Sequence, residues 1–122
     1  MAQVASPLQL YVDRLAHRDF DGLAALFDSH AQFRALIPPG FREASGATGS
    51  VDYLRRWFGD ADEIEVLWSR IDEIGERSSA SYKLRVHEDG EWYVIAQQVF
   101  CTIEGGKIAQ ADLLCSGFHR ET

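Results

Sequence analysis

The sequence is poor in the residues and motifs by which many classes of protein are recognised. It has only two cysteines, Cys101 and Cys115, too few for the disulfide framework of a small secreted protein, so we expect reduced thiols. No HExxH, Cys-x-x-Cys or GxSxG motif occurs, and no glycine-rich phosphate loop. The four histidines lack the spacing of metal ligands. We therefore expect no metal ion, no nucleotide and no other cofactor.

Basic residues and long uncharged runs are also scarce. The 12 Lys and Arg against 19 Asp and Glu give a formal net charge of −7, which repels a phosphate backbone, so nucleic acid is not an expected partner. Uncharged runs such as Trp92 to Ile103 are too short to cross a bilayer. Residues 1–15 lack the basic and apolar regions of a secretory leader. These absences predict a cytoplasmic protein without a membrane partner.

What the sequence does contain is enough apolar material for one core. Hydrophobic residues make up 46% of the 122 residues, which is typical of a folded globular domain. No repeat or linker divides the sequence. We therefore expect residues 1–122 to form a single domain.

Apolar side chains recur at helical spacing in three N-terminal segments. Ser6 followed by Pro7 is typical of a helix start, Asp19 can cap a second helix, and Gly59 is typical of a helix end. The residues from Pro38 to Ser50, which include Pro39 and Gly40, indicate an irregular loop. The apolar positions of the three predicted helices are Leu8, Tyr11, Val12 and Leu15, then Phe20, Leu23, Leu26 and Phe27, then Val51, Leu54, Trp57 and Phe58.

Beyond residue 63 the pattern changes to the alternation of half-buried strands. Asp89-Gly90 and Gly105-Gly106 are typical hairpin turns, so three long strands are predicted to follow one another to about Ser116. Helices first and antiparallel strands afterwards predict an α+β domain, with three N-terminal helices packed in a strongly curved antiparallel sheet. The alternating apolar residues are Ile64, Val66 and Trp68, then Ala80, Tyr82, Leu84 and Val86.

The first hairpin fixes which residues face each other. With a two-residue turn at Asp89-Gly90, Tyr82 lies opposite Gln97 and Ala80 lies opposite Val99. Together with Cys101, these residues share the concave, core-facing side of the sheet. Two polar groups on an otherwise apolar face need hydrogen-bond partners, which either a ligand or the two groups themselves can supply.

The second hairpin decides where the one candidate base points. A strict two-residue turn at Gly105-Gly106 places Asp112 opposite Val99, inside the domain. A single bulged residue instead turns Ala111, Leu113 and Cys115 inward and Asp112 outward. The apolar character of that strand favours the bulge. In either register Cys101 lies beyond disulfide reach of Cys115.

The outer face of the sheet carries charged residues but also apolar ones. Lys83, Arg85 and His87 alternate outward on one strand. Trp92 and Phe100 follow on the next strand, with Val94 between them. A partly apolar outer face indicates a partner surface, and we expect a homodimer through it.

The sequence resembles a known superfamily over nearly its whole length, and two segments carry the resemblance. They are Leu8 to Ala35, written LQLYVDRLAHRDFDGLAALFDSHAQFRA, and the hairpin at 99–108, written VFCTIEGGKI. They resemble the nuclear transport factor 2-like superfamily, including its SnoaL-like members. The resemblance implies a cone-shaped α+β barrel with one deep pocket and a homodimer packed through the sheet. The superfamily holds isomerases, dehydratases, epoxide hydrolases, polyketide cyclases and proteins without catalysis, so the resemblance does not select an activity.

The catalytic positions of two relatives are mostly apolar here. Ketosteroid isomerases pair a tyrosine with two acids, and by resemblance these positions fall at Tyr11, Ala35 and Val99, of which only the tyrosine is retained. Limonene epoxide hydrolases need an inward Asp-Arg-Asp set, and those positions fall at Ala80, Tyr82 and Leu113. No acid and base set is recognisable, which removes the usual route to proton abstraction.

Three hypotheses follow for the function. The first is a pocket-forming domain that binds a small, mostly apolar molecule without catalysis. The second is a SnoaL-like lyase, isomerase or cyclase, in which Asp112 is the base and Tyr11 or Tyr82 stabilises an oxyanion. The third is a protein-interaction module that uses the outer sheet face. Tyr11 and Trp57 also fit an ordinary core role. The candidate ligand contacts are Tyr11, Trp57, Tyr82, Gln97, Val99 and Cys101.

Overall fold

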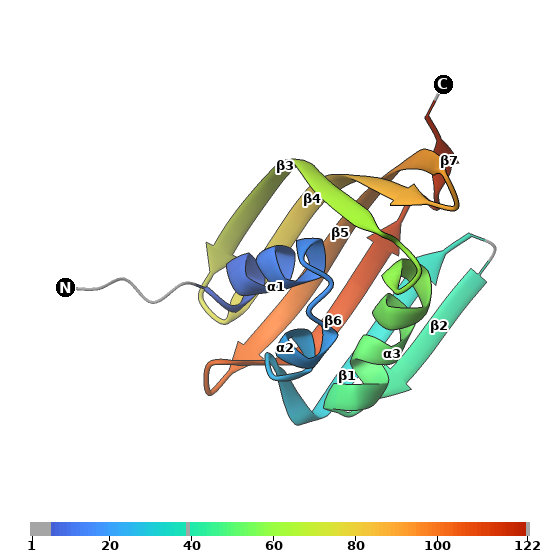
Figure 1. Cartoon of the computed structure of the whole chain (residues 1–122). Helices are drawn as coiled ribbons and strands as arrows, with labels where there is room; N and C mark the ends of the chain where they lie inside the picture. The colour runs from blue at the N-terminus through green and yellow to red at the C-terminus, as the bar shows by residue number, and fades with distance from the viewer. Residues whose placement is uncertain (1–5, 39, 122) are drawn as a thin grey trace.

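In the part of the chain that the structure describes, three helices pack against one face of a curved, open sheet of seven strands (Figure 1). A computed structural model describes residues 6–38 and 40–121. The expected α+β fold is confirmed. In chain order the elements are α1 (Pro7–Ala16), α2 (Phe20–Ala24), β1 (Phe27–Ile37), β2 (Gly40–Ser45), α3 (Ala47–Phe58), β3 (Glu63–Ile74), β4 (Arg77–Glu88), β5 (Glu91–Glu104), β6 (Lys107–Cys115) and β7 (His119–Arg120).

The helix starts follow the capping signals of the sequence. The Ser6 side chain accepts a hydrogen bond from the Gln9 amide at 3.2 Å, and Asp19 accepts one from the Gly22 amide at 2.9 Å. The second helix is shorter than its apolar stripe predicts. It ends at Ala24, and Phe27 begins β1, where it pairs with β6 instead of extending the helix.

The prediction of an irregular loop from Pro38 to Ser50 is wrong, because most of these residues lie in a strand or in the first turn of a helix. Residues Gly40–Ser45 form β2, which pairs antiparallel with β1 so that Phe41 lies opposite Leu36. The next segment is helical from Ala47. Pro39 lies outside the described residues. The alternation of exposed and half-buried residues along β2 is the strand signal that the neighbouring prolines and glycines concealed.

The sheet is mixed rather than antiparallel. Its strand order is β2-β1-β6-β5-β4-β3, with β7 paired to one end of β5. β1 runs parallel to β6, with Arg34 beside Asp112, while the other pairs are antiparallel. Parallel neighbours need a long crossover connection, and here the chain from β2 through α3 to β5 supplies it.

Both hairpins have the register that the apolar patterns favour. Asp89 and Gly90 adopt positive φ of 53° and 76°, as a tight primed turn requires, and Glu88 lies opposite Glu91. The pairing of Tyr82 with Gln97 is confirmed. On β5 and β6 the register shifts between Thr102 and Ile103, so Asp112 lies opposite Phe100 and faces outward.

The core lies between the helices and the concave face of the sheet. A second register shift on β3 turns Trp68 to the convex face, opposite Lys83, where it is 50% exposed. The bulge between Val66 and Trp68 therefore breaks the predicted alternation, and Trp68 does not share a face with Ile64 and Val66. None of the helices in residues 6–38 and 40–121 combines the length and the apolarity needed to cross a membrane.

Candidate functional site

Four elements bring polar side chains together inside the domain. Tyr11 lies on the buried stripe of α1, and Tyr82 of β4 lies opposite Gln97 of β5. Cys115 of β6 lies on the other side of Gln97. All four side chains are buried. We refer to Tyr11, Tyr82, Gln97 and Cys115 as the interior tetrad.

The interior tetrad is a continuous set of hydrogen bonds. The hydroxyl oxygens of Tyr11 and Tyr82 are 2.9 Å apart, and the Tyr82 hydroxyl donates to Oε1 of Gln97 at 2.5 Å. Nε2 of Gln97 donates to Sγ of Cys115 at 3.2 Å. In the described part of the chain, every buried side-chain nitrogen and oxygen has a partner. The polar groups of the concave face therefore satisfy one another.

Burial keeps these groups neutral. Loss of water around Tyr11 and Tyr82 raises the pKa of both hydroxyls well above the ordinary value of 10.0. Burial raises the pKa of the nearby Cys101 thiol to about 12 and also raises that of Cys115. Uncharged hydroxyls, an amide and thiols can orient a ligand by hydrogen bonding, but they provide no base with a pKa near neutrality.

The remaining predicted contacts lie around the interior tetrad without joining it. Val99 and Cys101 are buried on the same face of β5. Trp57 is half-buried on α3, where its ring stacks on Tyr53 with centroids 5.7 Å apart. Sequence reasoning did not single out Cys115 as a polar contact. The bulged register carried the necessary signal, because it pairs Gln97 with Cys115.

Asp112, the candidate base, lies on the convex face. Its carboxylate accepts two hydrogen bonds from the Arg34 guanidinium, at 2.7 and 2.9 Å, and this pairing raises the pKa of Arg34. The strict hairpin register, which would turn Asp112 inward, is not the one that the strands adopt. The carboxylate therefore faces away from Tyr11 and Tyr82.

The concave core contains no charged side chain among the described residues. Apart from the interior tetrad, the buried polar side chain there is Ser50, whose hydroxyl donates to the Gly46 carbonyl at 2.6 Å. Within residues 6–38 and 40–121, no group of three or more His, Cys, Asp or Glu is arranged to hold a metal ion. The interior is suited to an uncharged group.

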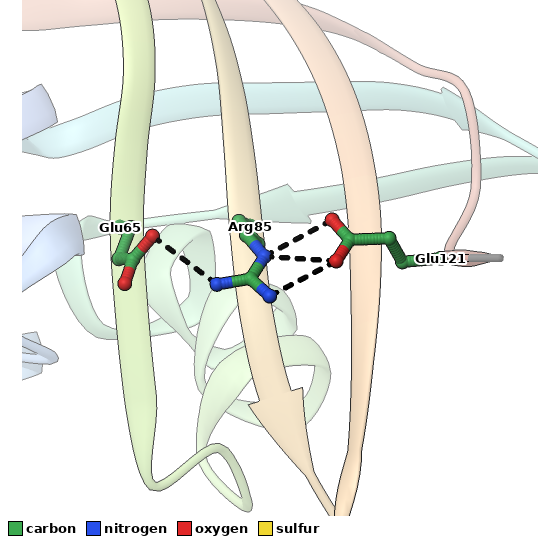
Figure 2. Close-up of polar contacts among 3 residues, drawn as sticks. All are labelled: Glu65, Arg85 and Glu121. Carbon is green, nitrogen blue, oxygen red and sulfur yellow. Dashed lines mark hydrogen bonds and ion pairs between the residues drawn. The ribbon is translucent and has the colours of Figure 1, made fainter.

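The convex face has two unlike ends. At one end, which we call the charged end, Arg85 stacks over the Trp92 ring at 3.8 Å and bonds Glu121 at 2.9 Å, with Glu65 at 3.6 Å (Figure 2). The Arg85 guanidinium therefore covers Trp92, which the sequence assigned to a partner surface. At the other end lies a hollow of about 750 Å³. We call the half-exposed residues in and around it the apolar end: Leu36, Phe41, Trp68, Phe100 and Leu114.

Comparison with known proteins identifies the fold and a family. A family model described as a SnoaL-like domain matches residues 8–111. A search of curated proteins finds no match. Among solved structures, a hypothetical protein with a ketosteroid isomerase-like fold from Catenulispora acidiphila, in complex with trimethylamine, is 11% identical with a TM-score of 0.76, over 93% of this chain and 88% of that one.

Two further solved structures carry enzyme names. A proposed polyketide cyclase from Xanthomonas campestris is 17% identical with a TM-score of 0.72, over 88% of this chain and 86% of that one. An LEH-like epoxide hydrolase from Mycobacterium tuberculosis is 16% identical with a TM-score of 0.68, over 90% and 80%. At such low identity the likeness is one of fold.

Proposed function

Because the chain belongs to the SnoaL-like family, we propose that it is a small binding domain whose concave face receives a small, mostly apolar molecule. The observation that carries this proposal is the interior tetrad, a set of neutral hydrogen-bonding groups in an otherwise apolar interior. Ligand sites commonly combine an apolar lining with a few convergent polar groups. Val99 and Cys101 supply apolar lining beside the tetrad.

We infer that the ligand enters on the Tyr11 side by a movement of α1. Tyr11 is 1% exposed and does not line the hollow of about 750 Å³, whereas Tyr82, Gln97 and Cys115 contribute to its wall. Its ring packs against that of Tyr82 with centroids 5.9 Å apart, so the movement has to open space beside this contact between α1 and β4 while the two hydroxyls stay hydrogen-bonded.

Catalysis by proton abstraction has less support. The relatives named as a cyclase and an epoxide hydrolase are enzymes by name. In this chain Asp112 pairs with Arg34 on the convex face, and the described concave core offers no carboxylate or imidazole in its place. A lyase or isomerase activity would have to rest on positioning and hydrogen bonding rather than on a concave base.

Native mass spectrometry of protein purified from its host, followed by NMR titration with any released molecule, tests the proposal. We expect a retained small molecule and amide shift changes centred on Tyr11, Tyr82 and Gln97. Tyr11→Phe should weaken binding about tenfold, because the ligand loses one buried hydrogen-bond partner. Tyr93→Phe, which alters a tyrosine that packs on Phe118, is the matched control. Shift changes confined to the convex face would contradict the proposal.

A second role is supported by the apolar end of the convex face. Its five residues come from five different strands, and the neighbouring Arg34 and Asp112 neutralise each other. Since the chain carries a formal charge of −7, two copies repel each other least where the surface is locally neutral. We therefore propose a homodimer that is formed by two apolar ends in an isologous contact.

Sedimentation velocity at micromolar concentration tests the dimer. We expect wild-type protein to sediment as a dimer and Leu114→Asp to sediment as a monomer, because the substitution places charge in the contact. Val94→Asp, near the charged end, should leave the dimer intact. Loss of the dimer with Val94→Asp alone would move the contact to the Trp92 side, and a monomeric wild type would remove the proposal.

A further inference from the structure

The hydrogen bonds of the interior tetrad have a definite direction. Tyr82 has a single hydroxyl proton, and Oε1 of Gln97 has none to give, so the 2.5 Å contact between them uses the Tyr82 proton. The 2.9 Å contact between the two tyrosines must then use the proton of Tyr11. Donation therefore proceeds from Tyr11 to Tyr82 and on to Gln97.

The orientation of the Gln97 amide fixes this direction. Its Nε2 faces Sγ of Cys115, and the same sulfur also accepts the backbone N–H of Gly117 at 3.4 Å. In this orientation the sulfur accepts from both donors, and the oxygen end of the amide is left to accept from Tyr82. With the amide reversed, Nε2 would donate to the Tyr82 oxygen, and the Tyr82 hydroxyl would donate to the Tyr11 oxygen. The Tyr11 proton would then be free.

Both hydroxyl protons are consequently used inside the protein. What remains at the α1 end of the interior tetrad is a lone pair on the Tyr11 oxygen, which can accept a hydrogen bond but has no proton to donate. This is the opposite of the role in which Tyr11 or Tyr82 stabilises an oxyanion. A ligand carbonyl placed at Tyr11 would bring one acceptor against another in a water-poor interior.

We propose that the molecule received by the concave face carries a hydrogen-bond donor, an alcohol O–H or an amine N–H on a small apolar skeleton, and that Tyr11 accepts it. This inference rests on the proposed binding function and names the chemical class of its ligand. Gln97 is the positioning residue, because the direction of its amide determines that Tyr11 acts as an acceptor.

Matched alcohol and ketone pairs on the same carbon skeleton test the proposal. Cyclohexanol with cyclohexanone, and borneol with camphor, are titrated into the protein and followed by amide NMR shifts. We expect each alcohol to bind about tenfold more tightly than its ketone, since the ketone leaves a buried acceptor without a donor. Ketones bound more tightly than alcohols would overturn the inference while leaving the binding function intact. Shifts with neither class would overturn both.

Replacing the amide tests the positioning role. In Gln97→Leu the Tyr82 proton is free to return to Tyr11, and the Tyr11 proton becomes available to a ligand. We expect the preference for alcohols, about tenfold in the wild type, to disappear in this variant, so that alcohol and ketone bind about equally. Tyr93→Phe should keep the preference. An unchanged preference in folded Gln97→Leu would contradict the role of Gln97.

A measurement without any ligand gives an independent check on the direction. In the wild-type protein we expect nuclear Overhauser contacts from the Gln97 side-chain amide protons to the β protons of Cys115. Contacts from those protons to the Tyr82 ring, with none to Cys115, would show the reversed amide and overturn the inference even if Gln97→Leu fails to fold.

Discussion

The two faces of the sheet handle their polar groups in opposite ways. On the concave face, the interior tetrad is buried and neutral, and its members hydrogen-bond to one another. On the convex face, many polar groups are charged and at least partly exposed, and several of them are held in ion pairs such as Arg34 with Asp112. Groups without charge can be buried at small cost, whereas charged groups stay near water. This contrast supports the proposals of recognition by hydrogen-bond direction on the concave face and of a partner contact on the convex face.

A single bulged residue separates these two environments along β6. Because successive side chains on a strand point to opposite faces, the shift between Thr102 and Ile103 places Leu113 inside and Asp112 and Leu114 outside. Without it, a carboxylate would enter the apolar interior. The contrast between the faces can therefore be tested with neighbouring residues.

The largest expected effect comes from truncating these neighbours one at a time. Leu113 is 2% exposed and Leu114 is 47% exposed. Leu113→Ala should lower the free energy of unfolding by about 2–5 kcal/mol, because a cavity remains in the core. Leu114→Ala should change it by no more than about 0.5 kcal/mol. Urea unfolding of both variants at several protein concentrations measures the difference. Equal losses would show that the two faces are not distinct in burial.

Removing the central hydroxyl of the interior tetrad should have the next largest effect. Tyr82→Phe leaves the Gln97 Oε1 without a donor and the Tyr11 hydroxyl without an acceptor. We expect a loss of about 1–3 kcal/mol in the free energy of unfolding, since a buried polar group is left without a partner.

Tyr93→Phe is the matched control for this loss. Tyr93 is half-buried on the same strand as Gln97 and makes an edge-to-face contact with Phe118, which a phenylalanine preserves. We expect a change close to zero in urea unfolding. A loss as large as that of Tyr82→Phe would mean that the tetrad is not a special source of stability.

The sequence predicted which face a residue occupies only where a local signal, such as a hairpin turn, was present. The two hairpin turns and the apolar residues of β6 were enough to place Tyr82 opposite Gln97 and to turn Asp112 outward. Turn chemistry is local, so it can be counted along the sequence. The bulge in β3 has no comparable signal in the sequence, so Trp68 lies on the face opposite to the one that the alternation of apolar residues predicted.

Pairing between distant strands was beyond such counting. The parallel contact of β1 with β6 joins Arg34 to Asp112, and no turn connects the two strands. The strand β2 was hidden by the neighbouring Pro38 and Gly40, which are read as loop signals. The part of the site that depends on hairpins was therefore predicted, and the part that depends on long-range pairing was not.

High pH should weaken the concave face in particular. Burial raises the pKa of Cys101 from 9.0 to about 12 in the folded protein. Its contribution to stability is complete below about pH 9 and is lost as the pH rises through about 12, because the unfolded chain releases the proton first.

Thermal or urea unfolding from about pH 8 to about pH 10 measures this loss. Cys101→Ala should lose about 1 kcal/mol less than the wild type over that range, whatever its stability at neutral pH. Leu114→Ala, on the other face, should follow the wild-type pH dependence. Parallel curves for the wild type and Cys101→Ala would indicate that the thiol is not held in its protonated form by burial.

Low pH should act on the convex face, with the smallest effect. Bonding to Arg85 lowers the pKa of the Glu121 carboxyl, so this pair stabilises the fold above the ordinary value of 4.5 and is lost as the pH falls through the lower, folded value. The Glu121 backbone N–H donates to the Trp92 carbonyl at 2.9 Å, next to the β5–β7 pairing, and reports on this contact. Glu121→Gln should lower the hydrogen-exchange protection of this amide at neutral pH. Acidification should reduce the protection in the wild type but should not reduce it further in the variant.

Glu104→Gln, at the other end of β5, is the matched control and should behave as the wild type. Unchanged protection of the amide in Glu121→Gln would show that backbone pairing alone holds β7.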